Sequence, residues 1–182
     1  MNILCKHPVW AMAFRPFYLL AALSGAVSIL AWTLGYQGTA ALPSLFWHAH
    51  EMIWGYAGAV VVGFLLTAVA TWTQQPPTRG LPLAILVLLW LLARLTVWFA
   101  GGAVWSGIFG TVFFAFAAVC MALPVVRSRN SRNYIAVAAL ALFGLTHALF
   151  HVYLAQGYAE GLRTGLWAGL MMVAGFISLV GM

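Results

Sequence analysis

The stretch Leu81–Ala100, LPLAILVLLWLLARLTVWFA, has one charged side chain, Arg94, in an otherwise apolar run. A run of ~20 apolar residues matches the hydrocarbon thickness of a bilayer when it forms an α-helix. Inside lipid the backbone polar groups must be satisfied within the segment, and a helix achieves this. The stretch therefore predicts a membrane-spanning helix and sets the fold class.

The rest of the chain has the same character. Its 182 residues are 65% hydrophobic and 5% charged, with a mean hydropathy of +1.02. Soluble domains carry roughly 25% charged residues, so this composition excludes them. We expect an all-α, polytopic transmembrane helical bundle, a single domain over residues 1–182 in contact with the lipid bilayer. The net charge of +6 is explained by basic loops that meet anionic headgroups, so no nucleic-acid partner is expected.

Polar breaks such as QQPPTRGLP and RSRNSRN divide the chain into six predicted spans. The first is expected to be retained, because no small-residue cleavage site follows a short apolar core. Cys5 and Cys120 lack metal-like spacing, and no disulfide is expected. The predicted spans cover about residues 17–36, 52–72, 81–100, 104–126, 134–155 and 162–181.

The basic residues predict the orientation. The side opposite to most of them holds only Arg163, while Arg94 lies within a span. The positive-inside rule then places both termini in the cytoplasm and the loop before the second span in a periplasm-like space. The expected location is a bacterial inner membrane. The residues on the cytoplasmic side are Lys6, Arg15, Arg79, Arg127, Arg129 and Arg132.

The motif WHAHEM, residues 47–52, holds two of the five histidines and one of the two acids. His48 and His50 are expected at the outer mouth of the second span. His147 and His151 follow Asn133 by 14 and 18 residues, about 21 and 27 Å along a helix. Four histidines are therefore predicted to converge on the outer layer of the bundle.

These side chains form a plausible cofactor site. Neutral imidazole binds metals and haem iron, and a thioether beside imidazole suits copper. His147 and His151 lie one turn apart on one helix face. His48 and His50 point to opposite sides on a regular helix, or converge on one ion at an irregular helix start. The alternative is a structural cluster of interfacial histidines. The predicted cofactor residues are His48, His50, His147, His151 and Arg94; the predicted metal ligands are His48, His50, Glu51, Met52 and His151.

Arg94 lies about 18 Å along its helix from Pro82. A charge at this depth costs about 2.5–3.5 kcal/mol on insertion scales. It therefore requires an anionic partner in the outer half of the bundle. Glu51 and a haem propionate are the two candidates.

Three segments carry a resemblance to a known family: FRPFYLLAALSG (residues 14–25), LFWHAHEMIWGYAGAVVVGFLLTAVATWT (45–73) and PPTRGLPLAILVLLWLLARL (76–95). They resemble the NnrS family. The resemblance implies an integral membrane protein that binds haem and copper and acts in nitric oxide metabolism, denitrification or protection from nitrosative stress. It makes His48 and His50 the leading ligand positions, with His151 a further one.

The family resemblance also implies about twelve spans, so this chain is expected to be a short member or an N-terminal half. A homodimer or a complementing second half is then an expected partner, besides nitric oxide or another small ligand. Two alternative functions are a copper-handling or transport protein without haem, and a non-catalytic assembly half. With two acids and no GxSxG or HExxH motif, the sequence leaves enzymatic activity open.

Overall fold

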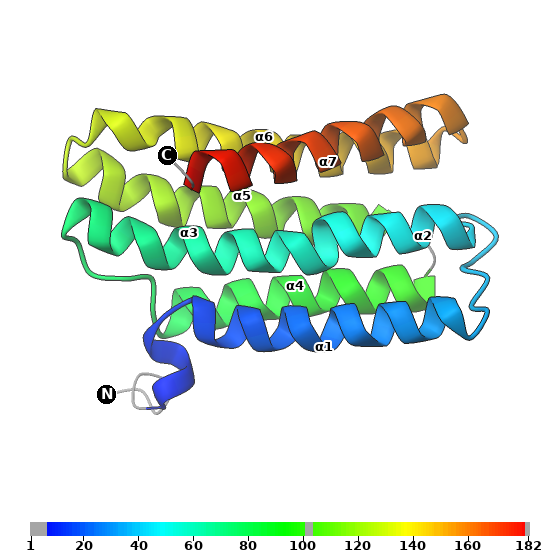
Figure 1. Cartoon of the computed structure of the whole chain (residues 1–182), viewed down its shortest axis with the longest axis horizontal. Helices are drawn as coiled ribbons and strands as arrows, with labels where there is room; N and C mark the ends of the chain where they lie inside the picture. Colours follow the sequence, from blue (N-terminus) through cyan, green and yellow to red (C-terminus); the bar gives the residue numbers. More distant parts are fainter. Residues whose placement is uncertain (1–6, 101–103, 181–182) are drawn as a thin grey trace.

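The computed structural model describes residues 7–100 and 104–180. Long helices lie side by side along one direction in a single bundle (Figure 1). The elements are η2 (Pro8–Ala11), α1 (Phe14–Thr33), α2 (Ser44–His50), η3 (Glu51–Ala57), α3 (Gly58–Thr73), α4 (Leu81–Ala100), α5 (Val104–Arg127), η4 (Ser131–Asn133), α6 (Tyr134–Ala155) and α7 (Ala159–Val180).

Six helices in the described residues are long and apolar enough to cross a membrane. The second consists of α2, the π-helical η3 and α3, which together form one helix from Ser44 to Thr73. Apolar side chains such as Leu19 and Leu88 point outward, as lipid contact requires. The protein is a multi-pass membrane protein, and the predicted all-α bundle with six spans is confirmed.

The second span begins earlier than predicted. We expected its start near Met52, but the helix begins at Ser44, so His48 and His50 lie inside it. Pro43 precedes the helix in an extended conformation, and its carbonyl accepts the first helical hydrogen bond, from the Trp47 N–H, at 2.9 Å. The predicted start was too late because the polar residues of WHAHEM are also typical of a loop before a span.

Other boundaries shift less. The first span runs from Phe14 to Thr33 rather than over 17–36, because the chain turns at Leu34 and Gly35 before the second helix. Gly35 has a φ of +88°, which favours glycine. Gly181, Cys5 and Lys6, which the sequence predictions included, lie outside the described residues.

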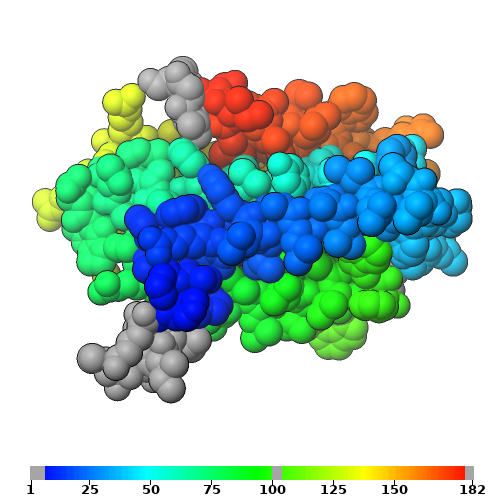
Figure 2. Space-filling view, turned by 60° about the horizontal axis from the view of Figure 1, so that its bottom comes forward, coloured from blue at the N-terminus to red at the C-terminus, as the bar shows by residue number. Residues whose placement is uncertain are grey.

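Close helix packing holds the bundle together. Phe114 of α5 inserts between Gly58 of α3 and Gly144 of α6. A Cβ added at either glycine would lie 2.8 or 2.7 Å from the Phe114 side chain. In lipid, such contacts between small residues and large ones drive helix association. Figure 2 shows α1 lying across one face, between α4 and the helix Ser44–Thr73.

The loops carry their charges asymmetrically. The α3–α4 and α5–α6 loops lie at the end of the bundle where α1 begins, and the α1–α2 and α6–α7 loops lie at the opposite end (Figure 1). At the opposite end, Arg163 pairs with Glu160 at 3.0 Å, and both side chains are exposed. The described arginines at the first end are Arg15, Arg79, Arg127, Arg129 and Arg132.

Candidate metal centre

Three histidines meet inside the bundle, near the end that carries the α1–α2 and α6–α7 loops. His50 ends α2, and His147 and His151 belong to the last turns of α6. One ligand atom from each lies within 4.8 Å of the others. His50 and His147 are fully buried, and His151 is 9% exposed. We call His50, His147 and His151 the three-histidine group.

The ring geometry of the group follows from helix periodicity. His147 and His151 lie one turn apart on α6, and their ring centroids are 4.6 Å apart. His50 approaches from α2, with centroids 5.4 Å from His147 and 5.2 Å from His151. The Nε2 atoms of His50 and His151 are 3.2 Å apart. Two spans distant in sequence thus present three imidazoles to one point.

A π-helical turn follows directly after His50. The Gly58 N–H donates to the carbonyl of Ile53, five residues earlier, as a π-helix requires. The Trp90 indole of α4 donates to the Gly55 carbonyl at 3.2 Å and fixes the turn against its neighbour. Such turns often occur at functional sites, because the extra residue re-aims the side chains around it.

A buried ion pair supports His50. Glu51 Oε1 accepts a hydrogen bond from Arg94 Nη1 at 2.5 Å and lies 3.1 Å from His50 Nδ1. Because a carboxylate paired with a guanidinium can only accept, His50 Nδ1 carries the proton, and its Nε2 presents a lone pair toward His151. A carboxylate that orients a metal-binding histidine in this way is a common arrangement around metals.

Helix α5 contributes space and a hydroxyl. A Cβ at Gly107 would lie 2.9 Å from His151 Cβ, and one at Gly110 would overlap the His147 ring. The Thr111 hydroxyl lies 3.2 Å from His147 Nδ1. Glycine at these two positions therefore lets α6 and its histidines pack against the α5 backbone.

The donor atoms fit a metal ion. Within the described residues, His147 Nε2 and His151 Nδ1 are buried without a hydrogen-bond partner. A buried unsatisfied polar group costs about 1–3 kcal/mol, and an ion bound at His147 Nε2 would remove this cost for that atom. Two nitrogen ligands at ~2.0–2.1 Å from one tetrahedral ion are roughly 3.3 Å apart, close to the 3.2 Å between His50 and His151 Nε2. An all-imidazole set suits copper or zinc.

Comparison with known proteins identifies the family. The family model described as NnrS protein matches residues 8–182. The chain belongs to the NnrS family. No curated protein and no solved structure matches it. The family resemblance noted on the WHAHEM and FRPF segments is thereby confirmed, and the three-histidine group is a feature of an NnrS-family chain.

The structure separates the two histidines of WHAHEM. His48 stacks on Trp32 of α1, with ring centroids 4.1 Å apart and planes 11° apart, and is not part of the three-histidine group. His50 points the other way, toward α6. Of the two arrangements open from the sequence, the helical one with opposed side chains is found. His48 and His50 both belong to the last turn of α2, at the same end of the bundle as His147 and His151, but only three histidines meet at one point, because His48 lies on the far face of its helix.

The remaining predicted residues take different places. Glu51 contacts His50 and Arg94 and is not one of the three grouped ligands. Arg94 is paired with Glu51, the first of its two candidate partners. Met52 is half-buried and also lies outside the group. The sequence analysis did not indicate Gly107, Gly110 or Thr111 as part of a site.

Haem fits the group less well than an ion does. The three rings are in contact, with centroids 4.6–5.4 Å apart, so a porphyrin cannot lie between any two of them. Trp54 and Phe150 close the space beside His50, with centroids 5.3 Å from it. The space among the three rings accommodates an ion and not a planar macrocycle.

We expect Gly110→Ala to destabilise the protein by about 1–3 kcal/mol, because the new Cβ would push the His147 ring out of place. Metal affinity should fall with it. Thermal unfolding in detergent and a copper titration would measure both effects. Gly175→Ala in α7 is the matched control, since a Cβ there has nothing within 4 Å. Equal stability and equal copper binding in the two variants would contradict the expected displacement.

Proposed function

We propose that this NnrS-family chain is a metal-binding protein of the bacterial inner membrane that acts in nitric oxide metabolism or in protection from nitrosative stress. The metal is copper, bound by His50, His147 and His151. The observation that carries the proposal is the convergence of these three buried imidazoles, with two Nε2 atoms 3.2 Å apart. Family membership supplies the link to nitric oxide.

The residues of the chain have distinct roles in this proposal. Copper, when bound, supplies one-electron chemistry and a coordination position for a small ligand. Glu51 fixes the tautomer of His50, and Arg94 balances the charge of Glu51. Trp54, whose indole donates to Thr146 at 3.2 Å, forms part of the apolar wall that keeps water from the group. Buried walls of this kind strengthen every charge interaction inside them.

The orientation of the chain is part of the proposal. Five described arginines lie at the end of the bundle opposite to the three-histidine group. The positive-inside rule supports a cytoplasmic location for that end and for both termini. The three-histidine group would then lie toward the periplasm.

A copper-handling function without haem is the second candidate. It is favoured by the close contact of the three rings, which leaves no room for a porphyrin among them. Haem, as the family association implies, would require a ligand elsewhere. His48 is the one histidine within a span that lies outside the group, and its Nδ1 has no hydrogen-bond partner in the part of the chain that the structure describes.

An absorption spectrum of the purified protein, oxidised and reduced, with metal analysis of the same sample, tests the proposal. We expect bound copper whose electron paramagnetic resonance signal shows imidazole nitrogen couplings and changes when nitric oxide is added. Copper that does not respond to nitric oxide would favour the handling function. A Soret band would show that haem binds too. A folded, metal-free protein that takes up no added copper would overturn the proposal and leave a structural cluster.

A further inference from the structure

We propose that the small ligand reaches the three-histidine group from the bilayer, through an apolar groove between α5 and α6 that ends at His151. The occupant is a small uncharged molecule dissolved in lipid, of the size of a diatomic gas. What this ligand does at the group rests on the proposed function. The route itself depends only on the shape and chemistry of the two helices.

The groove opens on the lipid-facing side of the bundle. It has a volume of about 410 Å³ and is lined by residues of α5 and α6 alone. Its walls include Ile108 and Val112 of α5 and Val152 of α6, which are 42%, 45% and 48% exposed. These side chains lie in membrane-spanning segments, so the mouth of the groove meets acyl chains rather than water.

The floor of the groove touches the three-histidine group at two points. His151 lines it, and is the one member of the group that is not fully buried. Thr111 also lines it, and its hydroxyl contacts His147 Nδ1. Gly107 lines the groove next to His151 Nδ1: a Cβ at this position would lie 3.2 Å from that nitrogen. Because glycine has no side chain, this space stays open. The Nδ1 atom is buried and has no hydrogen-bond partner among the described residues.

The lining selects the kind of molecule that can use this route. Apart from His151 and Thr111, its side chains are apolar, and the charged Glu51 and Arg94 do not line it. An ion would lose its hydration without a partner on the way, which costs several kcal/mol or more. A small uncharged molecule meets no such penalty. The groove therefore admits the ligand class that dissolves in lipid and excludes charged ones.

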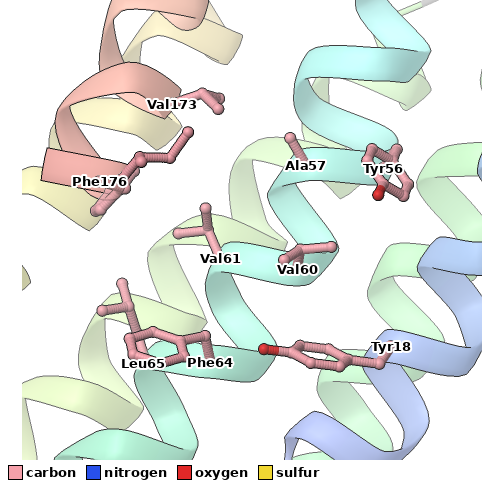
Figure 3. A pocket seen from close by; sticks show the side chains of 10 residues that line it. Tyr18, Tyr56, Ala57, Val60, Val61, Phe64, Leu65, Val173 and Phe176 are labelled. Atoms are coloured by element: carbon pink, nitrogen blue, oxygen red, sulfur yellow. The ribbon is translucent and has the colours of Figure 1, made fainter. Parts of the chain in front are cut away.

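A second groove provides the comparison. It lies between α1, η3, α3 and α7, has a volume of about 380 Å³, and is lined by Tyr18, Tyr56 and apolar residues (Figure 3). It is of similar size and also faces lipid, yet no histidine lines it. Of these two grooves, the α5–α6 groove is the one lined by residues that belong to or contact the three-histidine group.

The route can be tested without any metal. In metal-free protein in lipid nanodiscs with isotope-labelled histidines, dissolved oxygen serves as an apolar diatomic probe that broadens the signals of nuclei it reaches. Among the three grouped histidines we expect the strongest broadening at His151, since His50 and His147 are fully buried, and we expect its loss in Ala148→Trp, which fills the groove. Leu149→Trp is the matched control, since Leu149 is 41% exposed on the same helix and does not line the groove.

Val112→Trp on the opposite wall repeats the test should Ala148→Trp fail to fold. The route would be overturned if oxygen did not broaden the His151 signals in the native protein. It would also be overturned if the broadening were the same in a folded variant whose groove is filled. In copper-loaded protein, the same variants should slow nitric oxide binding several-fold with unchanged copper content. A protein that binds no copper but shows the oxygen effect would overturn the proposed function and leave the route standing.

Discussion

Arg94→Leu is expected to lower the free energy of unfolding by about 3–5 kcal/mol, because it leaves the Glu51 carboxylate buried without its counter-charge. Glu51 is 1% exposed and Arg94 6% exposed, so water cannot replace the lost partner. Gly55 lets the Arg94 guanidinium lie against the backbone of the π-helical turn, because a Cβ added at Gly55 would be 2.7 Å from Arg94 Nη1. Loss of Arg94 would therefore loosen the turn that holds His50.

Two variants make this prediction specific. Arg163→Leu removes the same charge from the exposed pair with Glu160 and should change stability little. The double variant Arg94→Leu with Glu51→Leu removes both buried charges and should recover most of the loss. Unfolding in mixed micelles measures all four proteins. If Arg94→Leu and Arg163→Leu unfold alike, the buried pair does not stabilise the bundle.

His50→Ala is expected to abolish copper binding. Outer partners of metal ligands typically contribute 10–100-fold in affinity, and a direct ligand contributes more. His50 is the only member of the group supplied by the second span, and its Nε2 lies 3.2 Å from that of His151. Without it, two histidines of one helix remain, which cannot enclose an ion by themselves.

His48→Ala is the control for this prediction, because it removes an imidazole from the same motif. His48 stacks on Trp32 and takes no part in the group, so copper binding should persist. Copper titration of both variants, with circular dichroism to verify folding, decides the matter. If His48→Ala lost copper and His50→Ala retained it, the metal site would have to include His48 rather than the three-histidine group.

Much of the fold could be predicted from the sequence, because the bilayer fixes the length and the apolar character of each span. Each span must be ~20 apolar residues long, and Leu81–Ala100 satisfies this on inspection. Helical periodicity likewise places His147 and His151 on one face. The need of a buried arginine for an anion pointed to Glu51, with which the structure pairs it.

The separation of His48 from His50 could not be predicted in the same way. It depends on whether the helix starts at Ser44 or at Met52, and polar residues near a span end are compatible with both. The π-helical turn carries no sequence signal of its own, since the segment Glu51–Ala57 would form an ordinary α-helix equally well. The roles of Gly107 and Gly110 arise only when α5 lies against α6, a contact between helices that periodicity does not specify.

The helix Ser44–Thr73 has 30 residues, which at 1.5 Å per residue is about 45 Å. A bilayer hydrocarbon core is about 30 Å thick, so the helix must tilt steeply or emerge from it. His50, about 9 Å from the helix start, then lies close to the boundary between acyl chains and headgroups. The surroundings of His50 therefore depend on membrane thickness. Thicker, more ordered lipid places His50 in the acyl region, and thinner lipid places it near the headgroups.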